Sequence, residues 1–249
     1  MISLPTDALL RRFLVVLAIG CIGALSSYGL LSYGLIPSLW KAVERRHPAL
    51  SSGTTCTVTK EGIPGDPLNI AVVGTEEALL QAMHRAQWNP ADPITLASSL
   101  RIAADSALRR AYDEAPVSNL FLWSKRQDLA FERPAGADPR TRHHVRFWRS
   151  AQPDSSTGRP FWMGAATFDT SVGVSHRTGQ VTHHIAADVD SERDQLLDAL
   201  RRSSAASVQW VEEFQPAGSG TNGAGDRYFT DRKLPVIELD ADGPKPAGN

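Results

Sequence analysis

The sequence predicts a single α+β domain behind one N-terminal transmembrane helix, with a mostly antiparallel or mixed sheet flanked by about three helices. A charge-free apolar run covers residues 13–36. Short strand-like segments cluster in the middle of the chain, and segments with apolar residues at helical spacing lie on both sides of that cluster. Because strands and helices are segregated, we do not expect a regular parallel β/α winding.

The apolar run has the length and the flanks of a membrane anchor. It spans 24 positions, more than the roughly 20 that a helix needs to cross a bilayer. Arg11 and Arg12 precede it, and Trp40 and Lys41 follow it, as is typical of a membrane–water boundary. We therefore expect an uncleaved anchor whose partner is the lipid bilayer.

Three alternatives compete with an uncleaved anchor: a cleaved signal peptide, a lipoprotein signal and a buried core helix. A signal peptide has a shorter apolar core, whereas this run continues past Ala24 and Ser26. A lipoprotein site at Cys21 would need a leucine three residues upstream, where the chain has Ala18. A core helix is seldom free of charge over this length.

The charges of the chain exclude one class of partner and only weakly indicate a location. Lys and Arg number 26 against 27 Asp and Glu, so we expect no nucleic-acid partner, because no excess of cations is present to bind phosphates. Basic residues nearly balance across the anchor. We expect a single-pass protein of the bacterial inner membrane, with the soluble domain in the periplasm.

Composition divides the chain into five parts. Cys21 and Cys56 are the only cysteines, too few for a cysteine metal motif, and their positions argue against a disulfide. The expected parts are a short N-terminal segment (1–12), the anchor (13–36), a juxtamembrane linker rich in Ser, Thr, Gly and Pro (37–67), the folded domain (68–239) and a disordered tail (240–249).

The expected domain begins with a strand and a helix. Residues 68–73 are an apolar strand, and Thr75 is the N-cap of a helix that ends near Asn89. A second helix should start at Thr95, and a third near Asp190. The strands expected between and after the helices are 119–123, 127–131, 143–148, 161–168, 172–176, 180–185 and 207–214, with a last pair within 227–239.

Histidines mark the segment most relevant to function. His143 and His183 share the more apolar faces of their strands, where an unpaired polar group is costly. Gly179 supplies the positive φ of a tight turn. With a three-residue loop His176 shares a face with His184, and with a two-residue loop it joins His183, so the register of the hairpin remains open.

These residues suggest a metal-dependent site. Imidazoles on neighbouring strands, together with a carboxylate, can bind a divalent metal such as zinc. We expect metal ligation by His143, His183 and Asp188, and catalytic roles for His176, His184 and Asp169. The alternative is that the histidines are structural and the acids cap the third helix. Asp128 and Glu132 share one strand face and could act as acid and base or bind a cation, but we expect them to form surface ion pairs with Arg126, Arg133 or Arg142.

Several motifs resemble the LssY C-terminal domain family of bacteria. The likeness covers about residues 67–214, and its pieces are PLNIAVVG, APVSNLFLW, QDLAFERP, RHHVRFW, GRPFWMGAATFDTSVGVSHRTGQVTHHI and DVDSERDQL. Such domains occur on membrane proteins, some of which also carry phosphatase-like or DedA-like membrane domains, and the resemblance implies work at the envelope near lipids. This chain departs by having one membrane segment, and the resemblance implies no reaction and no residue role.

The expected function is a membrane-anchored envelope domain that performs metal-assisted hydrolysis of a phosphoester or lipid-linked substrate. The rival is a non-catalytic accessory or binding module, whose partners would be envelope lipids or membrane proteins.

Overall fold

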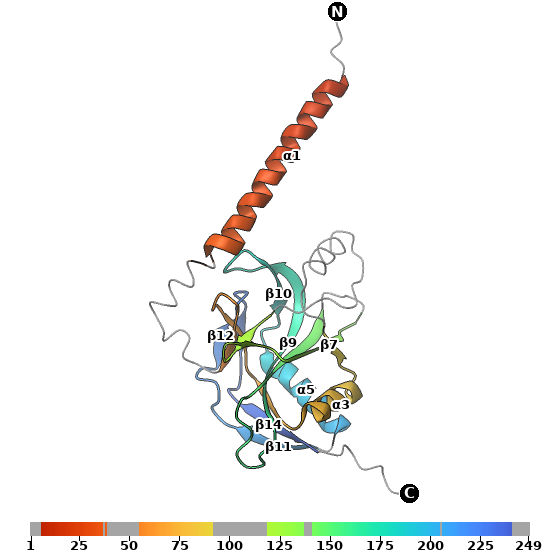
Figure 1. Cartoon of the computed structure of the whole chain (residues 1–249), viewed down its shortest axis with the longest axis vertical. Helices are drawn as coiled ribbons and strands as arrows, with labels where there is room; N and C mark the ends of the chain where they lie inside the picture. The colour runs from red at the N-terminus through yellow and green to blue at the C-terminus, as the bar shows by residue number, and fades with distance from the viewer. Residues whose placement is uncertain are drawn as a thin grey trace, which may run out of the picture.

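The protein is described by a computed structural model, which covers residues 6–36, 38, 55–91, 119–136, 141–204 and 206–240. The expected second helix, which starts at Thr95, most of the expected linker and nearly all of the expected C-terminal tail lie outside these residues. Within them the chain forms an α+β domain with a long helix projecting from it, as Figure 1 shows. The predicted fold class is confirmed.

The projecting helix is long and apolar enough to span a membrane. Helix α1 (Thr6–Leu30) continues into a π-helical turn, η1 (Leu31–Leu35). The apolar stretch Leu10–Leu35 comprises 26 residues. No residue in its most apolar part is buried against the domain. It is a candidate single-pass anchor, which agrees with the sequence prediction.

A mixed sheet of eight strands forms the centre of the domain. Its order is β11-β14-β3-β9-β8-β7-β4, with β10 paired to the far end of β9. Only β14 and β3 are parallel; the other pairs are antiparallel. The strands are β3 (Ile70–Val73), β4 (Asn89–Pro90), β7 (Leu129–Pro134), β8 (Arg142–Arg149), β9 (Phe161–Val174), β10 (Val181–Ile185), β11 (Ala206–Val211) and β14 (Leu234–Leu239).

Two helices cover one face of this sheet. Helix α3 (Glu76–Arg85) starts at Thr75, whose hydroxyl accepts a hydrogen bond from a backbone N–H in the first turn. Helix α5 (Val189–Ser203) packs beside it. Leu79 of α3 and Leu196 of α5 share one buried apolar cluster with sheet side chains that include Phe131, Phe147 and Trp162.

The other face of the sheet carries a smaller sheet of order β2-β1-β5-β6. Its strands are β1 (Cys56–Val58), β2 (Pro64–Pro67), β5 (Phe121–Leu122) and β6 (Lys125–Arg126). Two of these strands lie in residues that we expected to be linker. Their shortness and their Gly and Pro content hide them in the sequence, whereas pairing with β5 and burial of Leu68 and Leu120 on the main sheet hold them in place. A hairpin of β12 (Ser219–Thr221) and β13 (Arg227–Phe229) follows.

The β9–β10 hairpin has a register that we did not expect. Val181 pairs with Val174, so the connecting turn comprises residues 175–180 and His176 lies in the turn itself. Both expected registers, with two- or three-residue loops, are therefore wrong. The hydroxyl of Ser175 accepts hydrogen bonds from two backbone N–H groups of the turn, which stabilises the longer loop. Gly179 has the predicted positive φ, 70°.

Candidate functional site

The turn of the β9–β10 hairpin packs against the end of the apolar helix. The hydroxyl of Tyr28 donates to the carbonyl of Gly179, and the side-chain amide of Gln180 donates to the carbonyl of Ser32 at 3.1 Å. A Cβ at Gly179 would lie 2.7 Å from Oγ of Ser32, so glycine permits this close approach. These contacts hold the hairpin beside the last turns of the helix, where Figure 1 shows it.

One group of possible metal ligands lies on this hairpin and the loop before β13. His176, His184 and Asp226, here called the hairpin cluster, each offer a ligand atom, and these atoms lie within 4.8 Å of one another. Nδ1 of His184 is 2.7 Å from Oδ1 of Asp226, and the two imidazole centroids are 5.2 Å apart. His176 is exposed, while the other two members are half-buried.

Two glycines and one amide N–H shape the hairpin cluster. Gly173 lies under the His184 ring, where a Cβ would come within 2.7 Å of Nε2. The other ring nitrogen, Nδ1, faces Asp226. Gly225 allows its loop to approach His176. The second oxygen of Asp226 accepts the backbone N–H of Ile185 at 3.1 Å, which orients the carboxylate. Two imidazoles and one carboxylate are a set that suits a divalent ion such as zinc.

A second group of charged residues is buried around Arg142 of β8. His183 of β10 contacts this group from the face of β10 opposite to His184. Arg142 is its centre: Nε donates to Asp169 at 3.0 Å, one terminal nitrogen donates to Glu132 at 2.6 Å, and the other lies 3.4 Å from Nε2 of His183. Both carboxylates are buried. The expected surface pairing of Glu132 is therefore wrong in its location, since the pair lies inside the protein, while Asp128 pairs with Lys125 at the surface.

His144 links this centre to Arg146. Because a guanidinium only donates, the 2.6 Å contact from Arg146 makes Nε2 of His144 an acceptor. The proton of a neutral ring is then on Nδ1, which lies 3.0 Å from Oδ1 of Asp169 without the alignment of a hydrogen bond. Arg146 also donates to Asp66 at 2.8 Å, which ties the main sheet to β2.

These six residues (Asp66, Glu132, Arg142, His144, Arg146 and Asp169) are called the buried charge network. Burial alone would raise the pKa of Asp169, but His144, His183 and Arg142 outweigh it and hold that pKa well below its usual range. Burial lowers the pKa of His183 to about 4, opposed by Asp169 and reinforced by Arg142, so the ring is neutral at pH 7.

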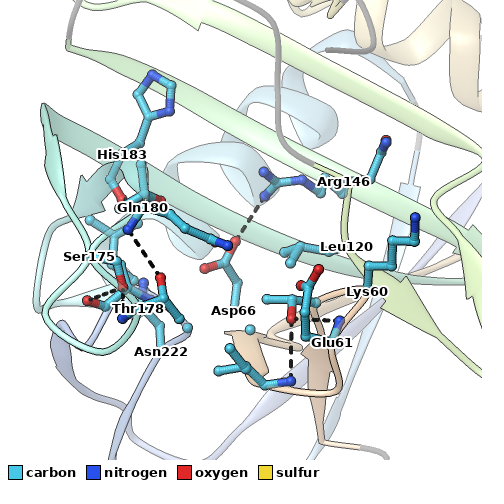
Figure 2. A pocket seen from close by; sticks show the side chains of 18 of the residues that line it. Lys60, Glu61, Asp66, Leu120, Arg146, Ser175, Thr178, Gln180, His183 and Asn222 are labelled. Carbon is cyan, nitrogen blue, oxygen red and sulfur yellow. Dashed lines mark hydrogen bonds and ion pairs between the residues drawn. The ribbon is translucent and has the colours of Figure 1, made fainter. Parts of the chain in front are cut away.

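Four members of the buried charge network, namely Asp66, His144, Arg146 and Asp169, form one wall of a cavity of about 230 Å³. The turn between β1 and β2 supplies Lys60 and Glu61, and the hairpin turn supplies Ser175, Thr178 and Gln180 on the other side, as Figure 2 shows. His183 also lines it. Gln180 both lines the cavity and bonds the apolar helix, so the cavity lies next to the end of that helix.

The residues that we expected to bind metal are not brought together. His143 faces the helices and bonds Glu192 at 2.7 Å, while His183 contacts Arg142 on the other face of the sheet. The carboxylate of Asp188 accepts two backbone N–H groups as the N-cap of α5. The two histidines therefore contact charged side chains, and Asp188 caps a helix.

Of the expected catalytic residues, His176 and His184 are brought together and Asp169 is not. Asp169 contacts Arg142 and His144, whereas the carboxylate beside the two histidines is Asp226. Sequence reasoning missed Asp226 because it lies 42 positions from His184 in a Gly-rich segment. The only signal there was an acid beside the glycine and asparagine of a tight loop.

The chain matches the model of a protein family. No curated protein and no solved structure matches the chain. The family model described as LssY C-terminus matches residues 43–234, which is most of the chain and extends beyond the 67–214 of the sequence resemblance. The apolar helix thus precedes the matched region, and the domain that carries both groups of charged residues belongs to the LssY C-terminus family.

Proposed function

We propose that this chain is a membrane-anchored envelope domain that hydrolyses a phosphoester or lipid-linked substrate with the help of a divalent metal such as zinc. The observation that carries the proposal is the hairpin cluster of His176, His184 and Asp226, with its ligand atoms within 4.8 Å of one another. Three protein ligands leave a fourth position for water, as in catalytic zinc sites.

The chemistry of such a site is hydrolysis. His176, His184 and Asp226 would hold the ion, which would supply a water activated near neutral pH as the nucleophile. In hydrolysis of a phosphoester the water oxygen bonds to phosphorus, the bond from phosphorus to the leaving oxygen breaks, and the leaving alcohol takes up the proton that the water gives up. The exposure of His176 supports access of a substrate from solvent or from the bilayer surface.

The choice of a lipid-linked substrate depends on how close the hairpin cluster lies to the membrane surface. About 20 helical residues cross the hydrocarbon core, so a span that begins at Phe13, after Arg11 and Arg12, ends near Ser32. Tyr28 and Tyr33, which stack edge to face 6.1 Å apart, then lie at the membrane–water boundary where tyrosine is enriched. Because Tyr28 contacts the hairpin turn, the hairpin cluster lies close to the lipid headgroups. We place the domain in the periplasm, with the lipid bilayer as its partner.

A second function, that of a non-catalytic accessory or binding module, is favoured by a different observation. His143 bonds the buried Glu192, and His144 lies between Arg146 and Asp169. These histidines have structural partners and need no ligand. A module of this kind would use the anchor for localisation and would bind envelope lipids or membrane proteins.

Zinc binding to the full chain in detergent micelles separates the two functions. Metal content after dialysis and the visible spectrum of the cobalt form report the site directly. His184→Ala and Asp226→Asn should each lower zinc affinity at least about a hundredfold, since loss of a residue that only supports a metal ligand already costs about 10–100-fold and these two residues would be ligands themselves. His84→Ala, an exposed histidine on α3, is the matched control and should bind zinc like the unmodified chain.

Zinc affinity equal in His184→Ala and His84→Ala would reject the metal site and leave the binding module. The second readout is hydrolysis of bis(4-nitrophenyl) phosphate by the zinc-loaded chain. Specific zinc binding without any hydrolysis of this phosphodiester would reject the hydrolase and retain a metal-binding module.

A further inference from the structure

We infer that the cavity between the hairpin turn and the β1–β2 turn binds a phosphoethanolamine group, which a membrane phospholipid presents with its ammonium pointing inward. This inference concerns a cavity that the hairpin cluster does not line, and it holds with or without a metal. Its support comes from size, charge, unpaired polar atoms and position.

The size of the cavity suits a small polar group. Its volume of about 230 Å³ is below the roughly 300 Å³ at which pockets for drug-sized ligands begin. Its lining is rich in side chains that accept or donate hydrogen bonds, among them Asn119, Thr178, Gln180 and Asn222. An acyl chain would leave these groups without partners, so a headgroup fits and a lipid tail does not.

The charges of the lining favour a cation inside and an anion at the mouth. Three acids, Glu61, Asp66 and Asp169, and two cations, Lys60 and Arg146, line the cavity, so the lining itself has one more negative than positive charge, and Arg142 behind it donates to Asp169. The exposed fraction of these acids decreases toward the interior: Glu61 is half-buried, Asp66 is 7% exposed and Asp169 is 0% exposed. Lys60 is exposed. A group with an ammonium at its tip and a phosphate behind it matches this order.

Unpaired polar groups mark where the ligand would bind. Among the residues that the structure describes, Lys60 and Glu61 have no ion-pair partner, although they are neighbours of opposite charge. Oδ1 of Asp169 is buried, and no described donor is aligned to it, the nearest being Nδ1 of His144 at 3.0 Å. An ammonium would supply donors to these carboxylates, and Lys60 would bind the phosphate. In Figure 2 Glu61 and Lys60 lie across the cavity from Gln180.

The same lining distinguishes ethanolamine from choline. Quaternary ammonium groups are recognised by the faces of aromatic rings, and no Phe, Tyr or Trp lines the described cavity. A primary ammonium, in contrast, has three donors for carboxylate oxygens. The cavity also adjoins the end of the apolar helix through Gln180 and Ser32, where headgroups are the nearest ligands.

Titration calorimetry on the full chain in a maltoside micelle tests the ligand. Glycerophosphoethanolamine should bind at least tenfold more tightly than glycerophosphocholine. Glu61→Gln should weaken the first compound about tenfold, because a charged hydrogen bond is worth at least this much. Glu77→Gln, an exposed acid on α3, should have no effect. Lys60→Gln should weaken glycerophosphoethanolamine but not ethanolamine itself.

Nanodiscs separate a lipid from a soluble source of the same chemistry. In discs of phosphatidylcholine the soluble compound should bind as in micelles, whereas added phosphatidylethanolamine should compete and raise its apparent Kd severalfold. Binding that ignores the lipid composition would overturn the lipid source. Equal binding of the two soluble compounds, or an unchanged affinity in Glu61→Gln, would overturn the assignment of the cavity.

Discussion

Replacing Arg142 with methionine tests whether the buried charge network is held together by this one cation. Arg142 is 4% exposed and donates to Asp169 and Glu132, which are 0% and 6% exposed. Methionine keeps much of the volume of arginine but leaves both carboxylates without their shared cation. Breaking a buried ion pair on one side costs about 3–5 kcal/mol, so we expect a loss of this size in the free energy of unfolding.

The loss should depend on pH in a specific direction. In the unmodified protein the pKa of Asp169 is held below its usual range, so its stabilisation is present above the unfolded pKa of 3.8 and is lost as pH falls through the folded pKa. Without Arg142 the pKa of Asp169 rises, because burial then has less opposition. The difference between variant and unmodified protein should therefore shrink as pH falls from neutrality through the folded pKa of Asp169 in the variant.

Denaturant unfolding of the full chain in micelles, followed by fluorescence of Trp148 and Trp162, measures this difference. Adding Asp169→Asn to Arg142→Met should restore part of the lost stability, because it removes one uncompensated charge. Lys125→Met is the control, since Lys125 forms an exposed pair with Asp128 worth at most about 1 kcal/mol. A loss in Arg142→Met no larger than in this control, or no recovery in the double variant, would refute the reasoning.

Two further substitutions test packing and capping. Gly164→Ala should lower the free energy of unfolding by about 1–3 kcal/mol in the same assay, because the added Cβ would lie 2.6 Å from Ile70 and 2.8 Å from Phe147; an unchanged stability would show that the sheet can relax there. Asp188→Ala should cost about 1 kcal/mol as a lost N-cap and leave zinc affinity unchanged, whereas a fall in zinc affinity would support the sequence-based metal assignment of this residue.

Local patterns were sufficient for the elements with strong periodicity. The apolar run, the Thr75 cap, the acidic start of α5 and the positive φ of Gly179 were all predicted correctly, because each depends on residues within a few positions of one another. The short strands β1 and β2 were hidden, since two to four residues with Gly and Pro have no usable period and are held by pairing with distant strands.

The candidate site was predicted in part. His176 and His184 were selected from the sequence, and the structure brings them together, but through a longer turn than we expected. Asp226 could not be paired with His184 in advance, because the contact joins residues 42 positions apart through a Gly-rich loop. Arg142 likewise looked like a surface charge until β7, β8 and β9 buried it between Asp169 and Glu132.

From the sequence alone follow an apolar helix long enough to span a membrane, an α+β domain of one family and a hairpin rich in histidine. The tertiary structure was needed to show which carboxylate faces which imidazole, where the cavity lies and that its wall contacts the end of the apolar helix. The physical reason is the distance along the chain between the residues that interact. Helix caps, turns and amphipathic faces depend on neighbours along the chain, whereas ion pairs, registers and cavities depend on strands that meet only after the sheet has formed.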